Sequence, residues 1–219
     1  MPADTAITNK KLYAYEKIKE MLLNGEISSA DPIIERQLCQ QLGISRTPVR
    51  EALQSLINDG LLTTIEGKGV FLRQANLRDI AEVSEVRLAL ESLAVFLFVE
   101  RATNETIQAL RAIFDTAETA LAQNDHARFM DCDMEFHLYI AQESKNIRLK
   151  EAINSNYTFI RYMAASVRED PEICSLASDN HAAIMEAIER RDKEAAAKCM
   201  AEHLRQVKIY HQNRYYLFQ

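Results

Sequence analysis

Hydrophobic residues recur at intervals of three and four along most of the 219-residue chain, which is the spacing of amphipathic helices. In the first part of the chain this pattern predicts a helix from about Asn9, after residues 1–8, which we expect to be disordered. The Asn24-Gly25 pair is expected to end it. The predicted apolar face consists of Leu12, Tyr15, Ile18 and Leu22.

Two further helices, over 33–42 and about 46–59, are predicted on either side of a sharp turn at Gly43. Ser45 is a suitable N-cap for the third helix, because its hydroxyl can accept from an unpaired backbone N–H of the first turn. Gly60 can take the left-handed conformation that ends a helix. A helix, a short glycine-containing turn and a second helix make the helix-turn-helix pattern.

The pattern changes after Gly60. Residues 61–65 are apolar and rich in β-branched side chains, residues 66–69 have turn chemistry, and residues 70–72 form a second apolar run. A small hairpin at this place is either a plain structural hairpin or a wing that contacts DNA. As a wing, it would bring its backbone to a phosphate or the minor groove through its glycines and would add a positive charge, with Gly67, Lys68 and Gly69 as the contacting residues.

Two arginines four residues apart, Arg46 and Arg50, form a basic edge at the start of the third helix. A guanidinium can donate two hydrogen bonds to the O6 and N7 of guanine or to a phosphate. The N-terminal end of a recognition helix is the end that reaches base edges. In isolation the pair is equally compatible with solvated surface arginines, but the surrounding helix-turn-helix favours DNA.

Beyond a short linker at 74–78, every segment predicts a helix. Residues 74–219 contain one proline, Pro171, and no glycine, so we expect an all-α antiparallel bundle over 76–219 that follows a DNA-binding domain over 1–75. The chain as a whole is therefore mainly α. The predicted helices of the bundle span residues 79–101, 103–123, 125–143, 147–168, 173–190 and 192–212.

The net charge of −6 is uneven, because residues 1–75 hold nine basic and nine acidic residues and the remainder carries the whole excess. A neutral domain can still bind DNA through locally placed arginines. The four cysteines are scattered, which fits reduced thiols in the cytoplasm. No apolar segment follows a basic N-terminus, and the most apolar stretch, from Leu88 to Val99, is too short to cross a bilayer, so we expect no membrane association.

Polar residues interrupt the inward-facing stripes of three predicted helices of the bundle. Asp133 and His137 lie one turn apart, and His181 and His203 flank the turn between the last two helices at nearly the same height. Buried imidazoles and carboxylates need partners. The four residues could be satisfied independently in the core, but their convergence favours a site for a divalent metal ion such as zinc or nickel. His126 and His211 are interpreted as surface histidines.

The N-terminal region resembles the winged helix-turn-helix of GntR-type bacterial transcription regulators. The resemblance covers residues 12–72, and one departure is Ser28-Ser29-Ala30-Asp31, where the family often has a Pro-Gly turn. Its principal match is the run Leu42-Gly43-Ile44-Ser45-Arg46-Thr47-Pro48-Val49-Arg50-Glu51-Ala52-Leu53, followed by Asp59-Gly60-Leu61 and Gly67-Lys68-Gly69-Val70. It implies DNA contacts by Arg36, Ser45, Arg46, Thr47 and Arg50, and by Gly67, Lys68 and Gly69 of the wing.

The segment from Leu77 to about His211 resembles the FCD domain of the FadR-like branch of this family. The resemblance implies that Asp133, His137, His181 and His203 hold a divalent metal, with zinc first and nickel or manganese as alternatives. It also implies a small organic acid as effector. Arg87 matches an arginine of that family and could pair with a ligand carboxylate or with Glu91.

Together these features predict a cytoplasmic, homodimeric transcription regulator that is not an enzyme. Each protomer would present one winged helix to half of a palindromic, double-stranded operator. Two other interpretations remain open: a metal-dependent hydrolase fused to a DNA-binding domain, and a regulator whose helical domain only dimerises. Release and promotion of DNA binding by the effector are both compatible with the sequence.

Overall fold

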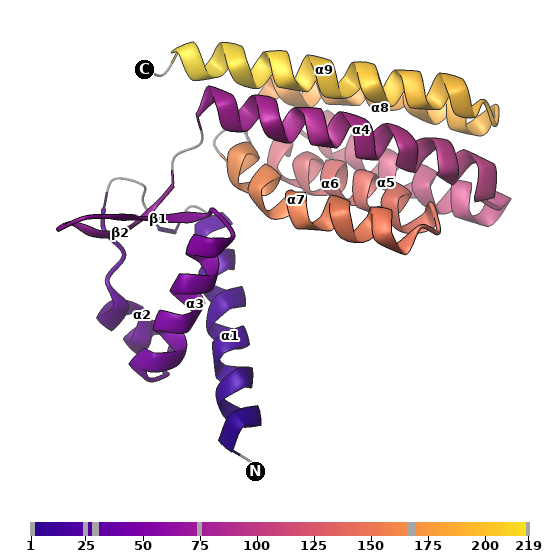
Figure 1. Cartoon of the computed structure of the whole chain (residues 1–219). Coiled ribbons are helices and arrows are strands. Elements are labelled where there is room, and N and C mark those ends of the chain that lie inside the picture. Colours follow the sequence, from indigo (N-terminus) through magenta and orange to yellow (C-terminus); the bar gives the residue numbers. More distant parts are fainter. Residues whose placement is uncertain (1–2, 24–25, 28–30, 74–75, 166–169, 218–219) are drawn as a thin grey trace. The chain divides into compact units, whose positions relative to one another are not determined.

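The structure, a computed structural model, describes residues 3–23, 26–27, 31–73, 76–165 and 170–217 (Figure 1). The chain divides into two compact units, of which the first comprises residues 1–75 and 161–165. The first unit is a winged helix-turn-helix, and the second is a bundle of helices. The expected fold class is confirmed: the chain is mainly α, and the strands among the described residues are those of the N-terminal hairpin.

The winged-helix unit contains a helix-turn-helix and an antiparallel hairpin. Gly43, with φ of 66°, makes the left-handed turn between its second and third helices, as expected, and Gly60 is also left-handed. The hairpin strands pair Leu62 with Leu72 and Ile65 with Gly69. Its elements are α1 (Ala3–Leu23), α2 (Glu35–Leu42), α3 (Arg46–Asn58), β1 (Leu62–Ile65) and β2 (Gly69–Leu72).

Two predicted helix starts in this unit are wrong. Helix α1 begins at Ala3 instead of Asn9, so the expected disorder of residues 1–8 does not hold from Ala3 onward. The predicted stop at Asn24-Gly25 lies outside the described residues. Helix α2 begins at Glu35 instead of Ile33, because the N–H of Ile33 donates to the carbonyl of Val70 at 2.7 Å and holds the chain extended beside the wing.

The core of the unit forms where α1 packs on α3. Val49, Leu53 and Leu56 of α3 are buried as predicted. On α1 the buried positions recur at exact steps of four, and Leu12 is not among them, since 58% of its surface is exposed. Its predicted place on the inner face is therefore wrong. The buried side chains of α1 are Ala14, Ile18 and Leu22.

The helical unit is an antiparallel bundle in which each predicted helix has its counterpart among the described residues (Figure 1). Helix α9 packs along both α4 and α8, and α5 packs on α6. Most boundaries agree within about two residues; α9 extends beyond the predicted end at 212, and the predicted end of α7 at 168 lies outside the described residues. The helices are α4 (Leu77–Arg101), α5 (Asn104–Ala122), α6 (His126–Glu143), α7 (Ile147–Ala165), α8 (Pro171–Glu189) and α9 (Lys193–Leu217).

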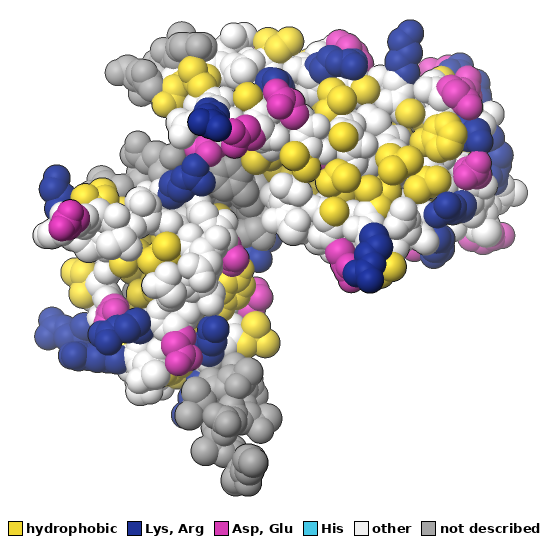
Figure 2. Space-filling model, viewed as in Figure 1, with side chains coloured by type: hydrophobic (Ala, Val, Ile, Leu, Met, Phe, Trp, Pro, Cys, Tyr) yellow, Lys and Arg dark blue, Asp and Glu magenta, His cyan; other side chains and the backbone are white. Residues whose placement is uncertain are grey.

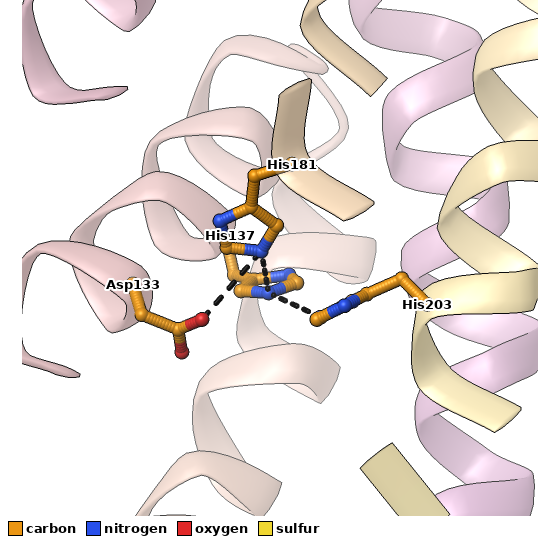
Figure 3. Close-up of side chains that lie close together, drawn as sticks. All are labelled: Asp133, His137, His181 and His203. Atoms are coloured by element: carbon orange, nitrogen blue, oxygen red, sulfur yellow. Dashed lines mark hydrogen bonds and ion pairs between the residues drawn. The ribbon is translucent and has the colours of Figure 1, made fainter. Parts of the chain in front are cut away.

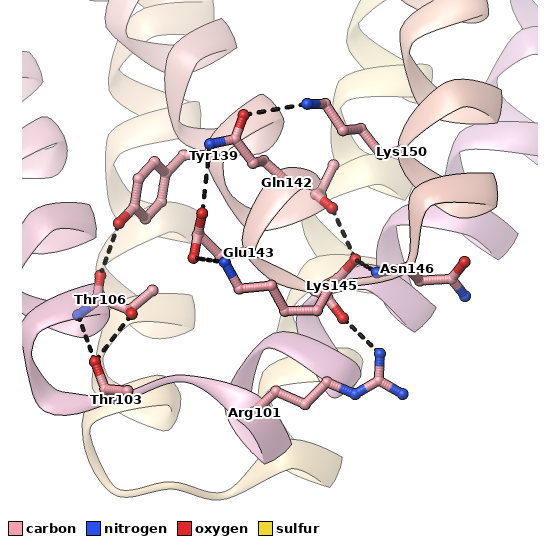
Figure 4. Close-up of polar contacts among 11 residues, drawn as sticks. Arg101, Thr103, Thr106, Tyr139, Gln142, Glu143, Lys145, Asn146 and Lys150 are labelled. Carbon is pink, nitrogen blue, oxygen red and sulfur yellow. Dashed lines mark hydrogen bonds and ion pairs between the residues drawn. The ribbon is translucent and has the colours of Figure 1, made fainter.

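Polar contacts hold the position of α6 at one end of the bundle (Figure 4). Arg101, in the last turn of α4, donates to the carbonyl of Ser144 at 2.6 Å, just after α6 ends. Thr103 caps α5 by accepting from the N–H of Thr106, whose carbonyl accepts from the Tyr139 hydroxyl of α6 at 3.4 Å. These contacts connect α4, α5 and α6, so the side chains that α6 directs into the core are well positioned.

Hydrophobic side chains also gather on the surface over α4 (Figure 2). Val86 is 43% exposed and Leu93 46% exposed, and Ala89 between them is exposed as well. They recur at the spacing of one helix face. Within the described parts of the chain, no helix is both long and apolar enough to span a bilayer.

Candidate functional site

The predicted DNA-contacting residues are all exposed on the winged-helix unit. Arg46 is the first residue of α3, and Figure 2 shows Lys and Arg side chains gathered over α2. Gly67 and Gly69 of the wing have φ of 71° and 110°, a backbone region in which other residues are strained. The exposed set comprises Arg36, Ser45, Arg46, Thr47, Arg50, Gly67, Lys68 and Gly69.

Ser45 occupies the N-cap position of α3 with the expected extended backbone. Its side chain makes no capping hydrogen bond, so the predicted hydroxyl cap is wrong. The hydroxyl is instead exposed beside Arg46 at the start of the helix. A hydroxyl at this position can donate to a DNA phosphate.

Arg50 is held by Glu35 of α2, a contact that the sequence analysis did not identify. Its Nε donates to Oε1 at 3.0 Å and its Nη2 to Oε2 at 2.9 Å. The hydrogen bonds from Arg50 lower the pKa of Glu35. The pair connects α3 to α2 and uses Nε and Nη2 of Arg50 but not Nη1. Arg50 is therefore oriented before any DNA contact. Neither Arg36 nor Arg46 has an ion pair among the described residues.

Replacing Arg46 with alanine is expected to cost about 1–3 kcal/mol of operator affinity, because a guanidinium that reads a base is worth that much. A gel-shift titration at fixed salt concentration measures the change. Arg190→Ala is the matched control, since it removes the same charge from an exposed position in the helical unit, where the arginine pairs only with Glu186 at 2.7 Å. Equal operator affinities for the Arg46→Ala variant and the unmodified protein would show that Arg46 does not recognise a base.

Three histidines and one aspartate converge in the core of the helical unit (Figure 3). Helix α6 contributes Asp133 and His137, α8 contributes His181, and α9 contributes His203. The Nε2 atom of His137 lies 3.2 Å from Nε2 of His181 and 3.2 Å from Nε2 of His203. One potential ligand atom from each of the four residues lies within 4.8 Å of all the others. The predicted convergence of the four is therefore present.

Burial favours the neutral form of two imidazoles of this cluster, those of His181 and His203. The three histidines are at most 2% exposed. Burial lowers the pKa of His181 and His203 well below the usual value, and the neighbouring His137 adds to the effect for both. Burial also raises the pKa of Asp133, against the opposing effects of His137 and Arg87. Neutral imidazoles have free lone pairs, which is the form that binds metals.

Hydrogen bonding between the rings does not account well for this geometry. A neutral imidazole nitrogen offers one in-plane lone pair, yet two other ring nitrogens approach His137 Nε2 equally closely. A zinc ion about 2.0–2.1 Å from each nitrogen, at tetrahedral angles, places neighbouring nitrogens about 3.3–3.4 Å apart. The residues present therefore fit a divalent ion, and the set of three nitrogens and one oxygen suits zinc, nickel or manganese.

A buried ion pair lies directly behind this cluster. Arg87 Nε donates to Glu91 Oε1 at 2.7 Å, and Glu91 Oε2 lies 2.6 Å from His137 Nδ1. The second contact is short, although its alignment is outside that of an ideal hydrogen bond. Of the two partners considered for Arg87, the structure shows Glu91. The contact between Glu91 and His137 was missed, although a glutamate within the most apolar stretch of the chain was a signal for it.

Tyr157 of α7 is a second residue that the sequence analysis missed. It is 5% exposed, its hydroxyl has no hydrogen-bond partner among the described residues, and its ring centre lies 5.9 Å from the Arg87 guanidinium carbon. Burial raises its pKa well above the usual value. A buried, unpartnered hydroxyl beside Arg87 is suited to a polar ligand group.

His211, interpreted as a surface histidine, is half-buried. Burial, followed by the charges of Arg87 and Arg214, lowers its pKa to about 4. His126, at the start of α6, is half-exposed.

Comparisons with known proteins agree with both units. The family described as "Bacterial regulatory proteins, gntR family" matches residues 10–72, and the FCD domain matches residues 82–206. The HTH-type transcriptional regulator YdhC of Bacillus subtilis is 27% identical over 88% of this chain and 86% of its own length. For the regulator McbR of Escherichia coli the identity is 27%, with 86% of each chain covered. The HTH-type transcriptional repressor NanR of Cronobacter sakazakii is 27% identical over 88% of this chain and 81% of its own length.

The solved structure of Escherichia coli McbR superimposes with a TM-score of 0.78 at 25% identity, covering 94% of this chain and 98% of that one. The match spans the winged helix, which carries the predicted DNA-contacting residues, and the helical unit, which carries the histidine cluster. The relatives are transcription regulators rather than enzymes. The chain is therefore a DNA-binding transcription regulator of the GntR family with an FCD domain.

Proposed function

We propose that this regulator is a cytoplasmic homodimer that senses a small organic acid through a divalent metal ion in its helical unit. The observation that carries the proposal is the convergence of three buried imidazoles and one carboxylate in a chain that also holds a winged helix. The cluster belongs to the helical unit and not to the predicted DNA-contacting residues. It would therefore bind a ligand other than DNA. The presence of NanR, a repressor, among the relatives supports repression as the mode of control.

The ion would be held by Asp133, His137, His181 and His203. When bound, it acts as a Lewis acid that accepts the carboxylate of the effector. Arg87 uses Nε for Glu91, and its Nη atoms remain for a ligand carboxylate. The unpartnered Tyr157 hydroxyl beside it can donate to a further oxygen of the same ligand. Zinc is the first choice, with nickel and manganese as alternatives.

Dimerisation is supported by the apolar face of α4. Val86, Ala89 and Leu93 are exposed on one side of this helix. A two-fold dimer would bury such a face against its own copy. Two winged helices related by the same axis would meet the two halves of a palindromic operator. Effector and operator binding are then linked reciprocally through the dimer.

The experiment that tests sensing is thermal unfolding of the full chain against a panel of small carboxylates, with and without a chelator. A ligand at about 100 times its dissociation constant adds about 2.7 kcal/mol to the free energy of unfolding. We expect a rise in melting temperature with one class of acid and its loss when the chelator removes the metal. Methyl esters of the same acids are the control, since they lack the coordinating charge.

A melting temperature unchanged by every acid and by the chelator would contradict sensing through a metal. That result would favour the alternative in which the helical unit only dimerises. Steady turnover of a carboxylate ester by the metal-loaded protein would favour the hydrolase alternative. Both readouts use the same protein preparation, so the three interpretations are separated in one series.

A further inference from the structure

The Glu91 carboxylate is enclosed in the helical unit, with a side chain that is 3% exposed. Its two oxygens have different partners, Arg87 on one side and His137 on the other. A buried carboxylate is costly unless it is paired. Both contacts are therefore needed to keep Glu91 charged at this place.

The charge of Glu91 determines which nitrogen of His137 carries the proton. Arg87 Nε lies 2.7 Å from Glu91 Oε1, and a carboxylate paired with a guanidinium in this way is the charged form. An ionised carboxylate only accepts hydrogen bonds, so Nδ1 of His137 is the protonated nitrogen. A neutral imidazole then has its lone pair on Nε2. That is the atom that faces His181 and His203.

We propose that Glu91 is the positioning residue of the metal site: it holds His137 in the tautomer and orientation that present Nε2 to the ion. The inference rests on the metal site of the proposed function. Glu91 contacts the other nitrogen of the ring and is not itself a ligand. Arg87 keeps Glu91 ionised. Arg87 is also the arginine expected to bind the effector, so the contacts from Arg87 through Glu91 to His137 connect the effector site with a metal ligand.

The test is the zinc affinity of full-length Glu91→Ala and Glu91→Gln variants, measured by competition with a chromophoric chelator. Loss of a carboxylate behind a ligating histidine typically weakens metal binding about 10- to 100-fold. We expect that loss in Glu91→Ala. A smaller loss is expected in Glu91→Gln, because an amide oxygen can face Nδ1 at the same place but carries no charge. Glu85→Gln is the control, because Glu85 lies on the same helix with 72% of its side chain exposed.

A double variant guards against loss of folding, since Glu91→Ala leaves the Arg87 charge buried and unpaired. Arg87→Gln combined with Glu91→Gln removes both charges at once, and we expect its zinc affinity to fall as far as that of Glu91→Gln. Nitrogen NMR of His137 and the absorption spectrum of the cobalt-loaded protein report the tautomer and the coordination. A purely structural Glu91 would change the melting temperature of the metal-free protein without changing either spectrum.

The outcomes separate the two proposals. Zinc affinities within about twofold of the unmodified protein in the folded Glu91 variants would overturn the positioning role and leave the metal site intact. An unmodified protein that binds neither zinc nor cobalt would overturn both proposals. Graded loss from Glu91→Gln to Glu91→Ala, with Glu85→Gln unchanged, is the result that supports Glu91.

Discussion

Replacing His137 with alanine is expected to weaken metal binding by at least about 100-fold. Zinc sites with four ligands have apparent binding free energies of about 10–16 kcal/mol, so one ligand is worth roughly 3 kcal/mol. His137 is central, because its Nε2 lies 3.2 Å from both other histidine nitrogens. Elemental analysis after dialysis, followed by a chelator competition, measures the loss.

The matched control for that variant is His126→Ala. His126 belongs to the same helix, α6, but lies outside the histidine cluster. Operator binding in the absence of effector should stay unchanged in both variants, since the predicted DNA-contacting residues belong to the winged-helix unit. One equivalent of metal held with unchanged affinity by His137→Ala would rule out His137 as a ligand.

The second large effect is expected from Leu93→Glu, which places a charge in the middle of the exposed apolar face of α4. Leu93 is 46% exposed in the single chain. If this face is buried in the homodimer, an unpaired carboxylate there opposes association. A monomer contacts one operator half at a time and loses the roughly 10²- to 10⁴-fold advantage of joined binding sites. Analytical ultracentrifugation measures association, and a gel shift on the full palindrome measures operator affinity.

Ile147→Glu is the control for this variant, because Ile147 is another exposed apolar residue, 62% exposed at the start of α7. It should leave both the dimer and the operator affinity unchanged. Affinity for an isolated half-site should be the same in all three proteins. A Leu93→Glu protein that sediments as a dimer would show that copies associate through a different face.

Local structure was largely predictable from the sequence. The order of helices and hairpin, the turns at Gly43 and Gly60, and the pairing of Asp133 with His137 on one helix face all agree with the structure. Each of these depends on residues within one or two turns of each other, where backbone preferences and hydrophobic periodicity act directly.

The errors arose where a distant part of the chain decided the outcome. Ile33 was expected to be helical, but Val70 of the wing holds it extended. Leu12 has the spacing of a core residue, yet α3 packs against a face of α1 that does not include it. His211, expected on the surface, is half-buried, and the charge of Arg87 from α4 acts on it.

By itself the sequence determined the two kinds of unit and the four polar residues on inward stripes of the bundle, and it predicted a DNA-contacting set on the recognition helix and wing. Only the tertiary structure decided that Glu35 holds Arg50, that Glu91 lies 2.6 Å from His137 Nδ1, and that Tyr157 lies beside Arg87. The physical reason is that periodicity specifies which face of a helix is buried, while the rotation and offset of helices against each other follow from close packing of the whole core. Contacts between side chains on different helices depend on that rotation and offset.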